Sequence, residues 1–557
     1  MREEDSPLAF DVVVIGSGTG LLAAVTAGEL GLRALVVEKS EYLGGSTAMS
    51  GGGFWIPGNS LLRDLGVPDS RERASAYLDA LVGDRAPRER RESFLDHGPA
   101  AVEVLRRNTP NSWQHMREYP DYFPEVEGGS PFGRAVEPKP FNLRLLGEYR
   151  TQLRPPGLAA PIPIPVTGRD YRWMNLAARR PLGALTAARR LGQGVGGLAL
   201  RREYAAGGQA LAAGLILAAR RQAVTLWTEA PLLDLVLDGG RVVGAVIECR
   251  GRPVTVLAER GVILSAGGFD RSAEMRHQYQ SAVVDGEWSL GSPANAGEVI
   301  RIAEGHGAVL TFMDQAWWFP AIPPAEAGGY PRPLLAERSL PGSIMVDGTG
   351  GRFMNEAVNY MTAGQIMLGQ DDGLPPHLPA WIIFDQAFRN RYLFGAVVMP
   401  RMPLPKTWYE AGLVHQAAAV AALGQQTYLP GLAVTVERFN LMAAQGHDDD
   451  FGRGNSMYDR YYGDPAVTPN PNLAPLVKPP FYAVKVVPGD LGTCGGIRAD
   501  EYARATRPDG SVIDGLYAIG NCAGNAFGSY YPGPGATIGQ GLVFGYIAAV
   551  HAAGKLT

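Results

Sequence analysis

Short apolar runs separated by small-residue turns mark the first forty residues of the chain. Residues 11–15 form an apolar run, residues 16–20 (Gly-Ser-Gly-Thr-Gly) break it, and an Ala- and Leu-rich stretch follows from Leu21 to Leu30. A second apolar run covers residues 34–37 and ends at Glu38. A short apolar run bounded by glycines is typical of a buried strand, and the longer Ala/Leu stretch is typical of a helix. The pattern therefore predicts strand, tight turn, helix and strand.

The turn has the spacing of a dinucleotide-binding fingerprint. Glycines there allow unusual backbone angles and a close approach to a pyrophosphate, and the following helix presents free N–H groups to the phosphates. Glu38 lies twenty residues after Gly18, where an acid that binds a ribose hydroxyl is expected. Leu21 stands at the third fingerprint position and Gly20 adjoins it, so the glycine that permits tight helix–strand packing is displaced by one residue.

A second match to the same spacing occurs at residues 192–197 (Gly-Gln-Gly-Val-Gly-Gly). No apolar strand precedes it and no acid stands twenty residues after Gly194. We therefore predict a plain loop there rather than a nucleotide site.

Further strand and helix patterns return the chain to the nucleotide-binding fold. Strand-like runs cover residues 232–237, 241–248 and 253–257, and a closing run covers residues 261–269. The pattern resumes with the strand-like run 515–521 and a helical stretch from about Thr537 to His551. Text rich in Pro, Trp and Tyr lies between them, from about residue 282. The sequence thus predicts an α/β fold, in which a Rossmann-like FAD-binding domain carries an inserted α+β substrate domain.

A chain of 557 residues is too long to fold around a single hydrophobic core, so we expect two or three domains. We expect residues 1–282 to form the first part of the FAD-binding domain, with a basic and apolar insertion at about 150–205. Residues 283–492 are predicted to form the catalytic domain, and residues 493–557 the second part of the FAD-binding domain.

Composition narrows the class of protein. With 46% hydrophobic and 19% charged residues and a net charge of −4, the chain is typical of a globular enzyme and gives no reason to expect nucleic acid. Three scattered cysteines exclude a disulfide framework or a zinc site, which fits a reducing cytosol. The polar, acidic start predicts no signal peptide, and no apolar run reaches a membrane-spanning length. We expect a cytoplasmic protein without a metal.

Residues 171–202 contain seven Arg and no acid, interleaved with Trp, Met and Leu. A basic and apolar segment can lie on an anionic bilayer surface. A solvated insertion packed on the neighbouring domain explains the same composition. Peripheral membrane contact therefore stays one of two interpretations.

The run from Tyr531 to Gly535 (Tyr-Pro-Gly-Pro-Gly) places a phenol and two flexible backbone units before the last predicted helix. The N-terminus of that helix would direct its dipole at the end of a flavin ring where negative charge collects on reduction.

These motifs together identify a resemblance to the bacterial 3-ketosteroid Δ1-dehydrogenases, within the larger flavoprotein family that also contains fumarate reductases. The resemblance covers essentially the whole chain. The matching segments are the fingerprint, the Gly-Gly-Ser-Thr loop at 44–47, Tyr-Pro-Asp-Tyr at 119–122, residues 136–142, Gly-Arg-Phe-Met-Asn-Glu at 351–356 leading to Tyr360, residues 489–493 and residues 531–535.

The resemblance implies that non-covalently bound FAD removes two hydrogens from ring A of a 3-oxosteroid and creates the 1,2 double bond, as a step of steroid catabolism. It assigns Tyr360 as the base that takes the proton from carbon 2, assisted by Tyr122, while hydride leaves carbon 1. The Tyr531 hydroxyl and the Gly535 N–H would stabilise the enolate oxygen. Because the unperturbed pKa of tyrosine is about 10 and burial raises it, a phenol base needs a neighbouring donor or a relay.

The remaining site predictions concern pocket and cofactor. Tyr119, Trp317 and Phe319 are candidates for the substrate pocket, although core packing explains Trp317 and Phe319 nearly as well. The predicted FAD-binding residues are Gly16, Ser17, Gly18, Gly20, Glu38, Lys39, Gly44, Gly45, Ser46, Thr47, Ser50, Gly51, Gly52, Ala230, Ala266, Gly267, Gly520, Asn521, Gly535, Thr537 and Ile538. The expected electron acceptor is a quinone or similar compound, and the lack of a second credible nucleotide site argues against direct exchange with NAD(P)H.

Two positions depart from the family pattern. Val358-Asn359 stands before Tyr360 where the family usually has a proline, which frees the backbone that orients the phenol. Cys494 replaces a lysine or similar residue before Gly495 and is expected to be inert.

Three alternatives remain open. A fumarate reductase-like flavoprotein could act on another enone, although a dicarboxylate is poorly served because the chain has no Arg between Asn521 and Gly541 to hold a carboxylate. A 3-oxosteroid 4(5α)-dehydrogenase shares ketone and flavin but attacks other carbons. A steroid-binding redox flavoprotein without turnover would not need the set of phenols.

Overall fold

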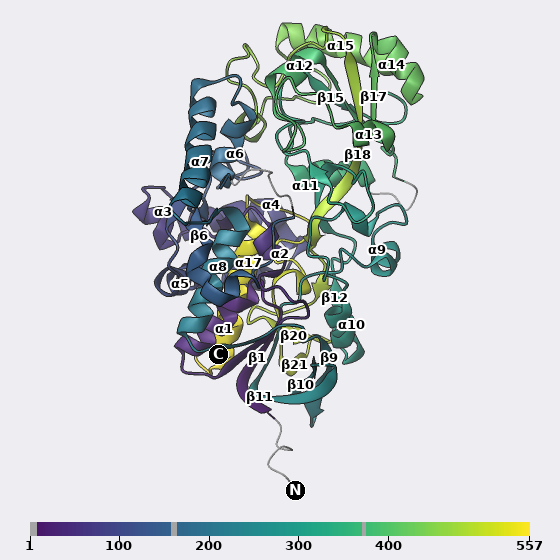
Figure 1. The fold of residues 1–557 in the computed structure, drawn as a ribbon. Coiled ribbons are helices and arrows are strands. Elements are labelled where there is room, and N and C mark those ends of the chain that lie inside the picture. The colour runs from purple at the N-terminus through teal and green to yellow at the C-terminus, as the bar shows by residue number, and fades with distance from the viewer. Residues whose placement is uncertain (1–7, 158–163, 370–374, 557) are drawn as a thin grey trace.

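The computed structural model of the chain describes residues 8–157, 164–369 and 375–556. The acidic start of the chain and residues 158–163 of the predicted insertion lie outside the described residues. Figure 1 shows two sheet-centred regions, one at the end of the molecule near the N-terminus and one at the opposite end, where α14 and α15 lie.

The sheet near the N-terminus has eight strands, with β1 (Leu8–Ile15) among its central strands. On its two sides β1 pairs in parallel with β2 (Ala34–Val37) and β11 (Arg252–Leu264). Beyond these lie β8 (Thr225–Trp227) and β21 (Val512–Ala518), also parallel, with β20 (Arg504–Thr506) antiparallel at the edge. The antiparallel strands β9 (Leu232–Asp238) and β10 (Arg241–Cys249) extend from β11. Strands from both halves of the chain thus build one sheet.

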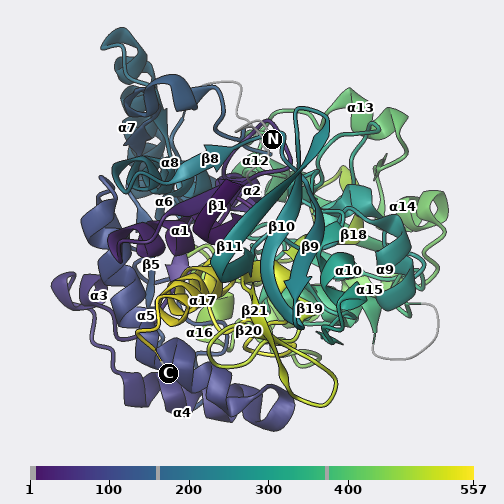
Figure 2. The ribbon, with the colours of Figure 1, turned by 90° about the horizontal axis from the view of Figure 1, so that it is seen from below.

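Alternating residues of β1 enter two different cores. Val12 and Val14 pack with α1 (Gly20–Glu29), α8 (Gly207–Arg221) and α17 (Ala536–Ala552). Val13 and Ile15 pack with β9, β10 and α10 (Glu298–Gly305) on the opposite face. Figure 2, seen from below, shows α1 and α17 beside one another and β9 to β11 in front. Burial on both faces explains why residues 12–15 of β1 are all apolar.

The second sheet has six strands around β18 (Phe481–Thr493). Its other strands are β13 (Ala316–Ile322), β14 (Arg332–Pro333), β15 (Ser343–Val346), β16 (Ala380–Asp385) and β17 (Val414–Ala417). Helices α14 (Val420–Thr427) and α15 (Leu432–Gln445) cover one face, α12 (Gln386–Arg391) and α13 (Lys406–Glu410) pack on the other, and α11 (Tyr360–Leu368) packs on β13. At the end of β18, the Thr493 hydroxyl accepts the N–H of Phe269 at 3.0 Å, which joins this sheet to the segment that follows β11.

The remaining helices and strands connect these regions. They are α2 (Gly45–Met49), α3 (Ser60–Asp64), α4 (Arg71–Val82), α5 (Arg88–Asn108), α6 (Gly168–Asn175), α7 (Pro181–Ala199), α9 (Ala273–Tyr279), α16 (Met457–Tyr461), β3 (Phe54–Trp55), β4 (Trp113–His115), β5 (Ala135–Pro138), β6 (Phe141–Asn142), β7 (Tyr204–Ala205), β12 (Leu310–Thr311) and β19 (Gly496–Ile497). None of the helices in the described ranges is both long and apolar enough to cross a bilayer.

Two local predictions were wrong. The predicted loop at 192–197 is part of α7, and Gly197 serves packing, since a Cβ there would lie 2.7 Å from the Tyr204 ring. The runs 253–257 and 261–264 are one strand, β11, because Gly261 adopts a φ of +134° and continues the strand from the β10 hairpin into the parallel sheet.

Candidate functional site

A cavity of about 560 Å³ extends from the carboxyl ends of β1 and β2 to a group of buried phenols. Most of the predicted site residues line it. They are Gly16, Ser17, Gly18, Glu38, Lys39, Gly45, Ser46, Thr47, Ser50, Gly51, Gly52, Tyr119, Tyr122, Ala230, Ala266, Gly267, Tyr360, Gly520, Asn521, Tyr531, Gly535, Thr537 and Ile538. Four predicted residues lie elsewhere: Gly20, Gly44, Trp317 and Phe319.

The fingerprint turn fits a pyrophosphate sterically. Gly16 has a φ of +107°, and a Cβ there would lie 2.3 Å from the carbonyl oxygen of Ser265. The ten-residue helix α1 then begins with no acidic residue in its first turn and no side chain capping it. Its free N–H groups and positive dipole end therefore remain available to an anion, as the phosphates of FAD require.

Gly20 supplies the close helix–strand contact. A Cβ at this position would lie 2.9 Å from side-chain atoms of both Val14 and Ser265. The displaced glycine therefore takes the packing role expected of the third fingerprint position, and Leu21 enters the core instead.

Glu38, at the end of β2, is fixed by hydroxyl groups. Its carboxylate accepts hydrogen bonds from the Ser17 hydroxyl at 2.6 Å and from the Ser40 hydroxyl at 2.9 Å. The carboxylate is 6% exposed and faces the cavity. A carboxylate held in this way is suited to accept hydrogen bonds from a ribose. Its neighbour Lys39 forms an ion pair with Glu298 at 2.6 Å.

The second glycine loop is clamped against α8 and a later segment. A Cβ on Gly52 would lie 2.2 Å from the backbone carbon of Gly207. The Ser46 hydroxyl accepts the N–H of Ser292 and the side-chain amide of Asn295, both at 2.9 Å.

Sequence reasoning missed the cavity-lining segment 290–300, which was assigned to the substrate domain. A signal was present, because small residues and Gly297 lead directly into α10, as in the fingerprint itself.

The phenols come from three distant segments. Tyr122 lies in a turn anchored by a hydrogen bond from its N–H to the Pro532 carbonyl at 3.0 Å, and Tyr360 is the first residue of α11. The Tyr122 hydroxyl donates to the Tyr360 hydroxyl at 2.7 Å. The Tyr531 ring lies 5.0 Å from the Tyr122 ring and 5.6 Å from the Tyr360 ring, both edge-on.

Gly535 is the N-cap of α17 and has a φ of +87°. A Cβ there would lie 2.2 Å from the Gly53 carbonyl oxygen. Only glycine therefore fits this position, and the start of a seventeen-residue helix faces the cavity beside Tyr531.

Burial dominates the acidity of the phenols. It raises the pKa of Tyr360 well above its usual value, and the hydrogen bond from Tyr122 opposes the rise. Burial likewise raises the pKa of Tyr122. Burial raises the pKa of Tyr531 only to about 12, because Tyr360 and the amides of Gly535 and Thr537 oppose it.

The three aromatic candidates for the substrate pocket differ in whether they line the cavity. Tyr119 lines the cavity and its hydroxyl accepts from the Tyr462 hydroxyl at 3.1 Å. Trp317 lies behind Tyr531, with ring centroids 4.6 Å apart, and its indole N–H donates to Asn521 at 3.0 Å. Phe319 is fully buried in β13.

Sequence reasoning also missed three tyrosines. Tyr171 and Tyr462 line the cavity, and Tyr458 packs edge-on against Tyr122 with centroids 5.1 Å apart. The spacing of Tyr458, Tyr461 and Tyr462 on and after one short helix was the available signal.

The two departures from the family pattern have local explanations. Asn359 caps α11, since its side chain accepts the N–H of Thr362 at 3.0 Å, and its backbone has a φ of −57°. Burial raises the pKa of the Cys494 thiol well above its usual value, so the thiolate is disfavoured. Within the described ranges, no group of three His, Cys, Asp or Glu side chains is arranged to hold a metal ion.

Comparisons with known proteins agree on one family. The FAD binding domain family matches residues 11–538. The 3-oxosteroid 1-dehydrogenase of Mycobacterium tuberculosis is 43% identical over 556 residues, covering 98% of each chain. The 4-oxocyclohexanecarboxylate 2-dehydrogenase of Sinomonas cyclohexanicum is 35% identical over 98% of this chain and 93% of its own. The solved structure of 3-ketosteroid Δ1-dehydrogenase from Sterolibacterium denitrificans, in complex with 1,4-androstadiene-3,17-dione, matches with a TM-score of 0.92 at 38% identity, over 98% of this chain and 99% of its own.

Proposed function

We propose that this protein converts 3-oxo-4-ene steroids to 1,4-diene-3-ones in steroid catabolism. The premise is that the chain belongs to the FAD binding domain family and, within it, to the 3-oxosteroid 1-dehydrogenases. The observation that carries the proposal is the hydrogen-bonded pair of Tyr122 and Tyr360, which lines one cavity with Tyr531 and Gly535. Bound FAD supplies the oxidant that accepts the hydride from carbon 1.

Tyr531 and Gly535 stabilise the oxygen of the 3-oxo group. A hydrogen next to a ketone is a weak acid, so its removal requires donors placed at the developing enolate oxygen. The Tyr531 hydroxyl and the N–H at the start of α17 are such donors, and the dipole of α17 favours negative charge at the same place.

Tyr360 takes the proton from carbon 2. Its oxygen accepts a hydrogen bond from Tyr122, which lowers its pKa against the effect of burial. A phenolate at Tyr360 would be stabilised by the same bond. Tyr122 therefore assists by holding charge on the base.

The central test is anaerobic addition of androst-4-ene-3,17-dione to the FAD-loaded protein, followed by product analysis. Bleaching of the flavin with formation of the 1,4-diene is the expected result. A small spectral shift without bleaching would support the non-catalytic binder and overturn the proposal. Bleaching only by a 5α-reduced 3-oxosteroid, with a 4-ene product, would identify the 4(5α)-dehydrogenase instead.

Substrate size is tested in the same assay. One full-length relative is named for a single-ring ketone, 4-oxocyclohexanecarboxylate. Apolar residues such as Val166, Pro333 and Leu335 line the same cavity as the phenols. We expect steroids to have the higher kcat/KM, because a single ring leaves this apolar wall uncovered. A quinone or similar compound is the proposed acceptor, and comparison of quinones with NAD(P)+ as acceptors tests it.

The membrane contact proposed for residues 171–202 is supported by an exposed apolar side of α7 and the turn after it. The exposed residues are Leu182 (49%), Leu185 (65%), Leu191 (40%), Val195 (51%), Leu198 (52%) and Leu200 (70%). Arg189, Arg201 and Arg202 are exposed with them. Three other arginines are neutralised, because Arg172 pairs with Glu118, Arg179 with Asp464 and Arg190 with Asp170. In Figure 2, α7 lies at the margin of the molecule.

Vesicle co-sedimentation tests this contact. Leu185→Ser together with Leu198→Ser should weaken binding of the FAD-loaded protein to phosphatidylserine vesicles and leave turnover of dispersed steroid unchanged. The matched control is Val434→Ser with Leu441→Ser, since these two residues are equally exposed on α15 (71% and 64%). Equal binding by both double variants would overturn the membrane assignment.

A further inference from the structure

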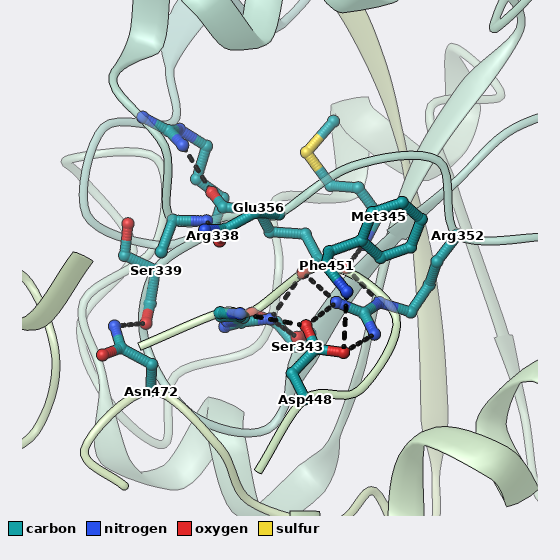
Figure 3. Close-up of polar contacts among 12 residues, drawn as sticks. Arg338, Ser339, Ser343, Met345, Arg352, Glu356, Asp448, Phe451 and Asn472 are labelled. Atoms are coloured by element: carbon teal, nitrogen blue, oxygen red, sulfur yellow. Dashed lines mark hydrogen bonds and ion pairs between the residues drawn. The ribbon is translucent and has the colours of Figure 1, made fainter. Parts of the chain in front are cut away.

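Arg338 is a fully buried guanidinium close to the phenols and lies outside the predicted site. Its Nε donates to the Leu334 carbonyl at 3.1 Å, and its Nη1 donates to the carbonyl of Glu356. Its Nη2 is buried and has no hydrogen-bond partner among the described residues. Figure 3 shows the side chain beside Glu356, which lies four residues before the predicted base Tyr360.

Two acids of the neighbouring segments already pair with other arginines, and burial raises the pKa of the adjacent Glu337 to about 7. The Glu356 carboxylate accepts from Arg352 at 2.8 Å and from Arg453 at 3.1 Å, and Arg352 also pairs with Asp448 at 2.8 Å (Figure 3).

Asp459 also favours the charged form of Arg338, but its carboxylate accepts hydrogen bonds from the Asn355 side-chain amide and from the Gly454 N–H, both at 2.9 Å. Within the described part of the chain, Arg338 has no carboxylate within ion-pair distance. A buried cation without a paired anion is costly, so another source of negative charge must offset it or its charge must serve the reaction.

The segments that hold Arg338 and Tyr458 lie side by side, because the side-chain amide of Asn472 donates to the Ser339 carbonyl at 2.8 Å and to the Asp459 carbonyl at 2.7 Å. Tyr458, Tyr119 and Tyr462 each favour the charged form of Arg338 and oppose the lowering of its pKa by burial. The Tyr458 hydroxyl is itself buried and without a hydrogen-bond partner among the described residues. Its ring lies 5.1 Å from the Tyr122 ring and 6.4 Å from the Tyr119 ring.

The positive charge of Arg338 favours the phenolate form of Tyr458. Burial raises the pKa of Tyr458 to about 12, and Arg338 is the strongest influence that lowers it. Burial raises the pKa of Tyr119 and Tyr122 well above the usual value, and the neighbouring phenols add to the rise. Arg338 is thus a cation that makes negative charge on Tyr458, which packs against Tyr122 and Tyr119, less costly.

We propose that Arg338 is a positioning residue for the dehydrogenation: its charge stabilises a phenolate shared by the tyrosine cluster, and its hydrogen bond to Glu356 fixes the segment that leads to Tyr360. This inference rests on the proposed function. The cluster loses one proton to solvent before reaction, and the Tyr360 oxygen then binds the proton that leaves carbon 2 and becomes a neutral phenol. No further reactant is needed.

The two roles are separated by two substitutions. Arg338→Lys keeps the charge, whereas Arg338→Gln keeps an N–H donor for the Glu356 carbonyl and removes the charge. In the Gln variant the acid limb of the kcat profile should move to higher pH by about one unit, so that kcat at pH 7 falls about tenfold with little change in KM. The Lys variant should keep the limb of the parent protein.

Arg389→Met is the matched control, because Arg389 is a buried guanidinium that bonds three backbone carbonyls away from the phenols. Its pH profile should not move. Tyr458→Phe removes a hydroxyl without a partner, so it should fold normally and shift the limb in the same direction by less. An acid limb that is unshifted in both Arg338→Gln and Tyr458→Phe would overturn the proposal. If Arg338→Gln folds poorly, an unshifted limb in Tyr458→Phe would overturn it by itself.

A readout independent of turnover distinguishes failure of this inference from failure of the proposed function. Alkaline titration of tyrosinate absorbance in the FAD-loaded protein without steroid should lose its lowest buried transition in Arg338→Gln. If Arg338→Gln loses that transition but the parent protein does not dehydrogenate steroids, the electrostatic role of Arg338 stands and the proposed reaction is wrong. An unchanged titration, in a protein that dehydrogenates steroids, would reject Arg338 alone.

Discussion

Replacement of Tyr122 by Phe isolates one hydrogen bond of the site. The Phe ring keeps the edge-on contacts with Tyr531 and Tyr458, whose centroids lie 5.0 and 5.1 Å away, and the position is only 3% exposed. The substitution removes the hydroxyl that donates to Tyr360 at 2.7 Å and changes little else.

The size of the effect follows from the charge on the acceptor. A hydrogen bond to a charged group contributes about 1.5–3 kcal/mol. If Tyr360 carries the negative charge when it accepts the proton, loss of this bond should lower kcat by roughly 10- to 100-fold. Because the bond from Tyr122 also lowers the pKa of Tyr360, the acid limb of the pH profile should move to higher pH.

Steady-state turnover of a 3-oxo-4-ene steroid across pH provides the assay. Tyr392→Phe is the control, since its buried hydroxyl donates to Asp464 at 2.9 Å outside the cavity. Its activity should stay near that of the parent protein. A Tyr122→Phe protein with kcat within about threefold of the parent and an unmoved limb would refute Tyr122 as the partner of the base.

Three further outcomes are expected. Gly16→Ala should lose most of its affinity for FAD in a fluorescence titration, because the new Cβ would lie 2.3 Å from a backbone oxygen at a φ of +107°; normal affinity would contradict the pyrophosphate assignment. Asn359→Ala should lower the free energy of unfolding by about 1 kcal/mol through loss of the helix cap, whereas Asn359→Asp should not, as measured by denaturant titration. Burial alone would raise the pKa of Glu356, but Arg352 and Arg453 lower this pKa below its usual value of 4.5. The ionised carboxylate therefore stabilises the fold above pH 4.5, and this stabilisation is lost as the pH falls through the folded-state pKa. Glu356→Gln should accordingly lower the melting temperature at pH 7 and flatten the loss of stability below pH 4.5; parallel curves would refute the ion-pair account.

Much of the FAD side of the cavity was predictable because its determinants are local. Glycines at fixed spacing, a strand before them and an acid twenty residues later lie within one β-α-β unit, so residues 11–38 could be interpreted from the chain alone. Strand β2 was predicted with its observed bounds, and α17 to within one residue at each end. The domain boundaries remain a prediction.

The substrate side was less accessible because its contacts are non-local. Tyr122 and Tyr360 are 238 residues apart in sequence, and only the family resemblance brought them together. Trp317 and Phe319 were candidates for the pocket wall because they are aromatic, yet both are buried in β13 and neither lines the cavity, although Trp317 packs behind Tyr531. Tyr458, Tyr462 and Arg338 belonged to no recognised motif, and their chemistry arises only from burial together.

Asn359 departs from the family motif, but its backbone conformation is one that the usual proline also adopts. A proline before Tyr360 would fix φ near −65° and stop the chain from entering the helix one residue early. Asn359 has a φ of −57° and a ψ of 150°, which are values that a proline also adopts, and its side chain supplies a helix cap that proline lacks. The loss of the ring is therefore compensated by a hydrogen bond to Thr362, so the first turn of α11 and the phenol of Tyr360 are held by a different interaction in the same conformation. If this compensation holds, Asn359→Pro should retain activity within a few-fold while Asn359→Gly, which keeps neither restraint, should lower kcat more than it changes KM.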